Sequence, residues 1–293
     1  MNSLIITSIE QGLIFAVLAM GVFLTYKVLD IADLSVEGTF PFGAFIFAKL
    51  AIMGLNPILA TILAFALGTL AGLLTATLFT KLNIKPILAG ILTMTILYSV
   101  NLKTNGKANV ALFKYKSIYD LGPTLLVLVI IVVLIKFILD QFLKTETGYL
   151  LIATGDNEAL VRALGENSNK YKLIGLMLAN GLVALSGAMM AQYQGFADMT
   201  MGNSIIVVAL ASIIIGDTIK KDSSKLRYTS RAIIGAIAYK IIGGIAIDLG
   251  LKPEDLRAVN AIIVIIFISY NNFSLNIFKS LKIKGGKAHV ENQ

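Results

Sequence analysis

Cysteine and tryptophan are absent from this sequence, and histidine occurs once, at His289 in a polar stretch. Without cysteine, no disulfide forms and no thiolate is available to a metal ion. A single histidine in a polar tail also argues against a histidine-rich metal site and against a histidine-based catalytic triad. We therefore expect no catalytic residues and no metal site.

Charged residues are scarce as well. They make up 14% of the 293 residues, whereas ordinary globular domains contain about 25%. Hydrophobic residues make up 57%, and the mean hydropathy is +0.83. This composition predicts a polytopic membrane protein and argues against a soluble multidomain protein. No basic residue precedes the first apolar run, so we expect no cleaved signal peptide.

Nine apolar segments come close to the roughly 20 residues that a helix needs to cross a bilayer core. Because nine is an odd number, the two ends of the chain are expected on opposite sides of the membrane. The expected spans are residues 5–26, 38–55, 57–80, 84–101, 122–143, 171–194, 204–219, 231–249 and 257–272.

Lysine and arginine are distributed unevenly between the two sets of loops. Six of them fall on one side, at Lys103, Lys107, Lys114, Lys116, Lys252 and Arg257. The richer side should be cytoplasmic, which places the N-terminus outside and the C-terminus inside. The net charge of +8 is also compatible with a nucleic-acid partner, but basic residues at span ends favour a membrane topology. The richer side carries Lys27, Lys81, Lys85, Lys144, Arg162, Lys170, Lys172, five residues between 220 and 231, and four between 279 and 287.

The longest polar interruption is TGDNEALVRALGENSN, residues 154–169. Asp156 is expected to cap the start of a helix and Gly165 to end it. The helix would have about two turns and one small apolar face, and its other face would be charged. Such a helix between two spans suits a groove on a soluble partner, and an ordinary solvated loop is the alternative. The apolar residues are Ala159, Leu160, Ala163 and Leu164, and the charged ones are Glu158, Arg162 and Glu166.

Two similar motifs indicate an internal repeat. The first, IADLSVEG, occupies residues 31–38, and the second, FADMTMG, occupies residues 196–202. Each follows a span rich in small residues, and the two spans run in opposite directions in the expected topology. This is the pattern of an inverted repeat that pairs spans 1–4 with spans 6–9. We expect one transmembrane domain over residues 1–293, in which 1–120 is the first repeat, 121–170 a connecting span and cytoplasmic helix, 171–275 the second repeat and 276–293 a cytoplasmic tail.

Polar residues near the two motifs are candidates for a translocation pathway. A charge inside the hydrocarbon costs a few kcal/mol or more, so such residues should face a cavity, a partner or an interface. Broken helices at both motifs would expose helix ends to a charged solute. Two alternatives stay open: the motif residues are surface loops, and the amides hold helices together. The candidates are Asp33, Ser35, Glu37, Asn180, Gln192, Asp198 and Thr200.

Two stretches carry a resemblance to a known family. ATGDNEALVRALG, residues 153–165, and ANGLVALSGAMMAQYQGFADMTMG, residues 179–202, resemble the coupling-helix region of ABC-importer permeases of the branched-chain amino acid and ribose type. Within that group they are most similar to permeases of tryptophan/tyrosine transporters. Sugar permeases of this class carry a similar DLSVG stretch, which Glu37 interrupts here.

This resemblance, which covers most of the chain, implies an all-α type II permease like that of the vitamin B12 importer, in the bacterial cytoplasmic membrane. It implies a homodimer, an ABC ATPase subunit and an external substrate-binding protein as partners. The solute would be an amino acid, with an aromatic one as the narrower expectation and a sugar or nucleoside as the alternative. The residues that would couple to the ATPase are Gly155, Asp156, Asn157, Leu160, Arg162, Ala163, Leu164 and Gly165.

The sequence has no phosphate-binding G-x-x-x-x-G-K-[ST] motif. An importer built on this chain must therefore use ATP and Mg²⁺ bound by a separate subunit, and we expect no cofactor on this chain. Two other classes compete. A secondary transporter would couple ions through Asp33 or Asp198. A membrane enzyme is disfavoured because no polar cluster has catalytic spacing.

Overall fold

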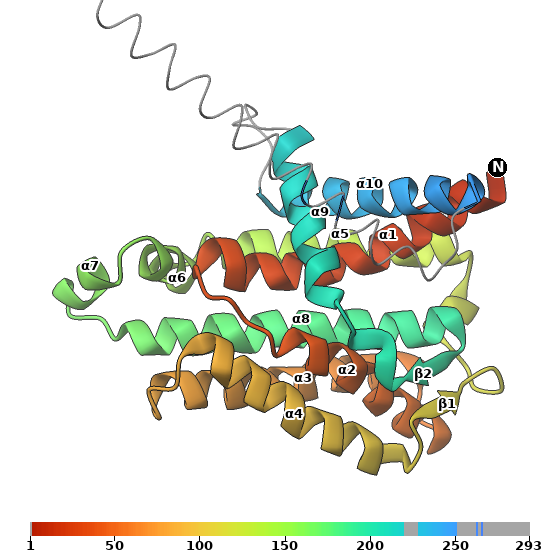
Figure 1. Cartoon of the computed structure of the whole chain (residues 1–293), viewed down its shortest axis with the longest axis horizontal. Coiled ribbons are helices and arrows are strands. Elements are labelled where there is room, and N and C mark those ends of the chain that lie inside the picture. Colours follow the sequence, from red (N-terminus) through yellow and green to blue (C-terminus); the bar gives the residue numbers. More distant parts are fainter. Residues whose placement is uncertain (1, 220–227, 251–261, 263–264, 266–293) are drawn as a thin grey trace, which may run out of the picture.

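The structure, a computed structural model, describes residues 2–219, 228–250, 262 and 265. Its described part is a bundle of long helices, with two short helices projecting at one end (Figure 1). Seven of the described helices are long and apolar enough to cross a membrane. The chain is therefore a polytopic helical membrane protein.

The first half of the chain contains four long helices. Helix α1 spans Asn2–Phe23 and continues as a π-helix, η1, over Leu24–Val28. It is followed by α2 (Val36–Ile52), α3 (Pro57–Thr80) and α4 (Pro86–Asn105). Proline occupies the first position of both α3 and α4, where its missing N–H and fixed φ are tolerated.

The second half of the chain begins with a connecting region. Helix α5 spans Thr124–Phe142, and the short helices α6 (Glu146–Asp156) and α7 (Glu158–Ala163) follow it. Then come α8 (Ser168–Gln194), α9 (Ile205–Ile219) and α10 (Tyr228–Asp248). Two 3₁₀ turns, η2 (Ile118–Leu121) and η3 (Met199–Gly202), precede α5 and α9.

Seven of the nine expected spans correspond to these apolar helices. The expected span 57–80 coincides with α3, and the others differ from the observed helices by a few residues at their ends. The expected span 38–55 corresponds to α2, which has 17 residues. The expected span 257–272, the tail 276–293 and His289 lie outside the described residues.

Helices α1 and α8 form the centre of the bundle. Each has 67% of its most apolar window buried, more than any other candidate span in the described part. The most extensive helix contact is between α3 and α8, and the next is between α10 and α1. The backbone of α2 crosses α8 closely, because a Cβ at Gly187 would overlap the carbonyl oxygen of Phe40.

The expectation of an all-α protein needs one correction. Strand β1 (Asn109–Ala111) pairs antiparallel with β2 (Phe196–Asp198), and Asn109 lies opposite Asp198. The pairing extends beyond the strands, because Leu112 donates its N–H to the carbonyl of Gly195 at 2.7 Å. This ladder joins the segment after α4 to the segment after α8, at the end of the molecule opposite α6 and α7 (Figure 1).

Replacing Gly187 by valine should destabilise the fold, because the new side chain would overlap the backbone of α2 at Phe40. We expect the free energy of unfolding to fall by about 1–3 kcal/mol, as in other overpacked interiors. Thermal unfolding of the detergent-solubilised chain measures this. Gly243→Ala is the matched control, since open space surrounds Gly243 in α10. An equal loss of stability in both variants would contradict the close crossing.

Candidate functional site

The first helix break lies between η1 and α2, over residues 29–35. The chain leaves the helical path at Asp30, whose φ of +54° lies in the left-handed region. Asp33 then turns the chain back: its Oδ1 accepts the backbone N–H of Ser35 at 2.9 Å and the Ser35 hydroxyl at 2.5 Å. Helix α2 begins directly after this turn. Polar backbone is tolerated at such a break only where protein or water surrounds it.

Asp33 and Ser35 belong to a buried polar cluster that also contains Asn180. The Asn180 amide nitrogen donates to Asp33 Oδ2 at 2.8 Å, and its Oδ1 lies 3.0 Å from the Ser35 hydroxyl. Thr39, which the sequence analysis did not identify, donates its hydroxyl to Asn180 Oδ1 at 2.7 Å. Asp33 is only 3% exposed, and Asn180 is fully buried. In this conformation the cluster holds the first break against α8, which agrees with the helix-holding alternative for Asn180.

The second helix break lies between α8 and α9, over residues 195–204, and repeats the turn of the first. Asp198 Oδ1 accepts the backbone N–H of Thr200 at 2.7 Å and the Thr200 hydroxyl at 2.5 Å. Its other oxygen accepts from Asn109 at 2.9 Å. Burial raises the pKa of Asp198, but the hydrogen bonds from Thr200 and Asn109 hold that pKa below its ordinary value. The two motifs therefore share one local geometry.

The two breaks meet at Glu37. A Cβ at Gly202 in η3 would overlap the backbone carbonyl of Glu37, so glycine is needed for this approach. The backbone N–H of Ser204, just before α9, donates to the Glu37 carboxylate. Among the described residues Glu37 has no basic partner, in contrast to Asp140 and Asp217, which pair with lysines.

A cavity of about 520 Å³ opens beside this meeting point. Glu37, Gly38 and Pro41 contribute from α2, and η3 contributes residues that include Thr200. The α4 face of the cavity is formed by side chains that recur along one side of that helix. Two of the sequence-derived candidates, Glu37 and Thr200, thus line one space. The α4 residues are Met94, Thr95, Tyr98 and Asn101, and the remaining ones are Ala108, Met199 and Asn203.

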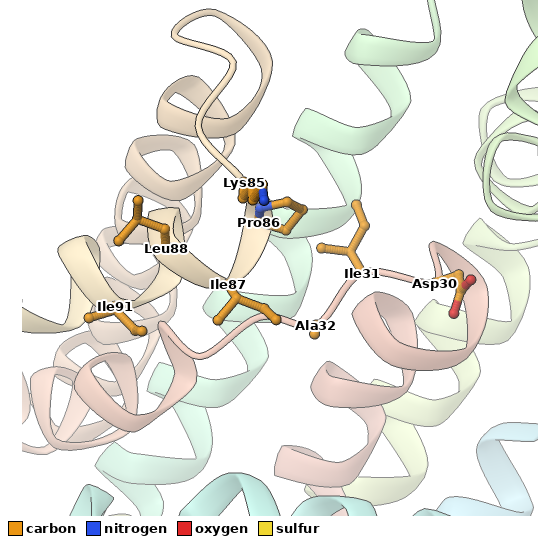
Figure 2. Close-up of a pocket in the computed structure, with 8 residues that line it drawn as sticks. All are labelled: Asp30, Ile31, Ala32, Lys85, Pro86, Ile87, Leu88 and Ile91. Carbon is orange, nitrogen blue, oxygen red and sulfur yellow. The ribbon is translucent and has the colours of Figure 1, made fainter.

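A second cavity, of about 570 Å³, lies where the first break meets the start of α4 (Figure 2). Ile31, Ile87 and Leu88 give it a largely apolar lining, and Asp30 lies at its far end from Ile91. Binding sites for polar solutes combine apolar walls with several polar groups that point inward. The cavity beside Glu37 meets that description better, so we take it as the candidate site.

Gln192 does not line either of these cavities. Its Oε1 accepts the backbone N–H of Ile118 at 2.9 Å, and its Nε2 donates to Thr61 at 2.9 Å. It therefore joins α8 to η2 and α3. This agrees with the helix-holding alternative for the amides of α8.

The polar stretch 154–169 contains a helix, α7, that differs from the expected one in its cap. Asn157, not Asp156, caps α7, because the Asn157 side chain accepts the N–H of Leu160 at 3.1 Å. Asp156 is instead the last residue of α6. The expected stop at Gly165 is confirmed by its φ of +84° and by its hydrogen bond to the carbonyl of Arg162.

A polar network fixes α7 against the start of α8. Glu158 pairs with Arg162 along α7 and with Lys172 of α8 at 2.8 Å, and it accepts from Ser168 at 2.9 Å. The hydrogen bond from Lys172 is the largest cause that lowers the pKa of Glu158 to about 2. Val161 is buried beneath the helix, whereas Leu160 is 51% exposed and Leu164 is 67% exposed. The apolar surface of α7 is therefore presented outward on a fixed support.

Helix α6 connects this region to the first break. Gly155, near the end of α6, lies so close to η1 that a Cβ there would overlap the carbonyl oxygen of Val28. Val28 is the last residue of η1 and immediately precedes the break at residues 29–35. Leu29 packs in turn on Gly175 of α8. A displacement of α6 and α7 would thus act directly on the backbone that leads to Asp33.

Comparison with known proteins gives a consistent set of relatives. Residues 4–269 match the family described as branched-chain amino acid transport system, permease component. A tyrosine transport system permease protein of Clostridioides difficile is 40% identical over 278 residues, covering 94% of each chain. The ribose import permease protein of Escherichia coli K12 is 27% identical, covering 90% of this chain and 84% of the relative. No solved structure matches the chain.

Removing the Asn180 amide should destabilise the first break, because the Asp33 carboxylate would lose a buried donor. We expect Asn180→Leu to lower the free energy of unfolding by about 1–3 kcal/mol. The double exchange Asp33→Asn with Asn180→Asp keeps one carboxylate and one amide in the cluster and should recover part of that loss. Thermal unfolding in detergent compares the three proteins. Stability that is unchanged in Asn180→Leu would show that the cluster does not hold the break.

Replacing Glu158 by glutamine should loosen α7, because the ion pairs to Lys172 and Arg162 disappear. Hydrogen exchange of residues 157–168 in the intact chain should become faster, whereas Glu146→Gln, an exposed acid on α6, should leave it unchanged. The folded pKa lies below the ordinary 4.5, so this stabilisation is complete above pH 4.5 and is lost as the pH falls toward 2. Equal exchange in Glu158→Gln and wild type would contradict the support role.

Proposed function

The chain belongs to the family of branched-chain amino acid transport system permease components, and we propose that it is the membrane-spanning subunit of an ATP-driven ABC importer. The observation that carries this proposal is the fixed, outward-facing apolar surface of α7 beside the first helix break. A permease needs such a surface if its energy comes from a separate ATPase. Bond chemistry would take place only on that partner, which would hold ATP and Mg²⁺.

An inverted repeat is supported by two features of the fold. The turns at Asp33 and Asp198 have the same hydrogen bonds to residues two positions later. The first long helix of each half also packs on a helix of the other half, because α1 packs on α10 and α8 packs on α3. We propose the type II permease architecture with nine spans, in which α2 is one of the spans and residues 257–272 supply the ninth. The repeats would be residues 1–120 and 171–275, joined by 121–170, with 276–293 as a tail.

The proposed orientation places α6 and α7 in the cytoplasm. In Figure 1 these helices lie at the same end as the connection between α3 and α4, and the β1–β2 pair lies at the other end. The α3–α4 connection contains Lys81 and Lys85, which belong to the basic set of loops. The positive-inside rule then places the N-terminus outside and the C-terminus in the cytoplasm of a bacterial cell.

We propose that α7 is the coupling helix and that Leu160 and Leu164 are the centre of its docking surface. The exposed residues that flank them include Asp156, Asn157, Arg162, Ala163 and Gly165. Nucleotide-driven closure of the ATPases would move α7 and α6, and Gly155 would transmit this movement to Val28. The first break would then shift relative to α8. Alternating access follows if this shift opens the path on one side and closes it on the other.

A second copy of the chain would complete the translocation path. The cavity beside Glu37 opens on the outer surface of α4, where Tyr98 is 59% exposed. A polar opening at membrane depth must face water or protein rather than lipid. We therefore propose a homodimer in which this α4 face lines the path between two copies. An external binding protein would deliver solute at the β1–β2 end.

An amino acid is the solute we propose, and an aromatic one is the narrower choice. The support is the 40% identity to a tyrosine transport system permease protein, compared with 27% to a ribose import permease. A sugar is the alternative, because the ribose relative also covers most of the chain.

In the ion-coupled alternative, a secondary transporter, uptake would depend on Asp33 or Asp198. ATP-dependent uptake that survives neutralisation of both aspartates would count against ion coupling.

Co-purification from native membranes tests the importer directly. We expect an ABC ATPase to accompany the tagged wild-type chain and to be lost from Leu160→Asp with Leu164→Asp, since both leucines are exposed on α7. Leu121→Asp is the matched control, because Leu121 is 67% exposed at the opposite end of the molecule. Arg162→Glu is a less specific variant, because it would also break the pair with Glu158.

Two outcomes of this experiment would change the proposal in different ways. If no ATPase accompanies the wild type in mild detergent, the importer is wrong and the secondary transporter becomes the leading alternative. If the ATPase binds the α7 variant as well as it binds Leu121→Asp, the importer stands and the coupling surface lies elsewhere.

A further inference from the structure

The cavity beside Glu37 contains a carboxylate without a basic partner and an amide oxygen without a hydrogen-bond donor, among the described residues. Glu37 is half-buried at the first turn of α2 and accepts a backbone N–H from Ser204, but no basic side chain of the described residues pairs with it. Asn101 is fully buried, and its Oδ1 has no hydrogen-bond partner within the described part. An unpaired buried acceptor is unfavourable, so a donor from a ligand that reached Asn101 Oδ1 would be stabilising.

Asn101 contacts the backbone beside Glu37. The Asn101 amide nitrogen is 3.4 Å from the carbonyl oxygen of Gly38, the residue that follows Glu37. This contact leaves the Asn101 amide oxygen as the free end of the side chain, and both residues line the same cavity. A carboxylate and a free amide oxygen accept hydrogen bonds without donating any. The complementary ligand group is a cation with several N–H donors.

We propose that Glu37 and Asn101 form the recognition site for the protonated amine of the transported solute. This inference rests on the proposed function and names the chemical class of its solute, an α-amino acid or related primary amine. A cationic amine would compensate the charge of a carboxylate held in a poorly solvated site, and charge-assisted hydrogen bonds are stronger than neutral ones. Sugar hydroxyls carry no charge to compensate Glu37.

The remainder of the cavity suits the other parts of an aromatic amino acid. Asn203 supplies an amide donor for a carboxylate, whereas the hydroxyls of Thr95 and Thr200 already donate to the Ile91 carbonyl and to Asp198. Met94 and Met199 supply polarisable thioethers, which make favourable contacts with aromatic rings. The volume of about 520 Å³ lies in the range of about 300–1,000 Å³ that is typical of small-molecule pockets.

The cavity also lies where an incoming solute would first meet the membrane-embedded part. Two of its lining residues, Ala108 and Met199, flank the β1–β2 pair, and the N–H of Met199 donates to the Ala108 carbonyl at 3.0 Å. In the proposed orientation this end faces outward. The site would therefore select the solute on entry, before the breaks rearrange.

Ligand-observed NMR titration of the purified full-length chain in lipid nanodiscs tests the site. The probes are L-tyrosine, tyramine, 3-(4-hydroxyphenyl)propionate, which lacks the amine, and D-ribose. We expect L-tyrosine and tyramine to bind and the propionate to bind at least about tenfold more weakly, a factor within the range of one charge-assisted hydrogen bond. Ribose should bind more weakly than either amine.

Two variants locate the binding to these residues. Glu37→Gln can still accept the Ser204 N–H but carries no charge, so it should weaken both amines by about tenfold and leave the propionate unchanged. Asn101→Leu should weaken the amines by a smaller factor. Glu146→Gln, on the exposed side of α6, is the control and should bind as the wild type does.

The site would be overturned by equal binding of the propionate and tyramine, by tighter binding of ribose, by no binding of either amine, or by unchanged amine binding in Glu37→Gln. Co-purification of the ATPase with each variant separates this failure from a failure of the importer proposal. An ATPase that accompanies Glu37→Gln while amine binding is absent from the wild type leaves the importer intact and removes only the amine site.

Discussion

The arrangement of the bundle depends on one buried carboxylate that is held by neutral donors. Asp33 has hydrogen bonds from Ser35 and Asn180, and neither of these donors carries a positive charge. A basic partner would neutralise the carboxylate, but it would bury a second charge at a further desolvation cost. Neutral hydrogen bonds satisfy the carboxylate oxygens, and other neutral donors could replace them. The first break is therefore held by interactions that a modest displacement can replace.

The same turn appears at Asp198 under different conditions. There the aspartate is partly exposed and bonds to Asn109 of the β1–β2 pair, whereas Asp33 is enclosed by α8. The same local turn is thus held against a helix at Asp33 and against a strand at Asp198. Glu37 lies where the two segments converge, so the acid that interrupts the first motif occupies a cavity wall and not a turn position.

Much of the fold was predictable because long apolar runs determine where helices can lie. Gly165 marked a helix end. The cap of α7 was misplaced by one residue because Asp156 and Asn157 are both good capping residues. The pairing of β1 with β2 was not predictable, since strands of three residues carry no readable alternation. Thr39 and Asn180 are 141 positions apart, and nothing local in the sequence indicates their contact.

The β1–β2 pair has a mechanical consequence. Antiparallel strands slide only in whole-residue steps, and a single step would turn every side chain to the opposite face. The ladder between residues 108–112 and 195–199 therefore joins the two halves firmly, at the end of the bundle opposite α6 and α7. A rocking movement between those halves would turn about this ladder. Its displacement would grow with distance along the bundle and would be largest near α7.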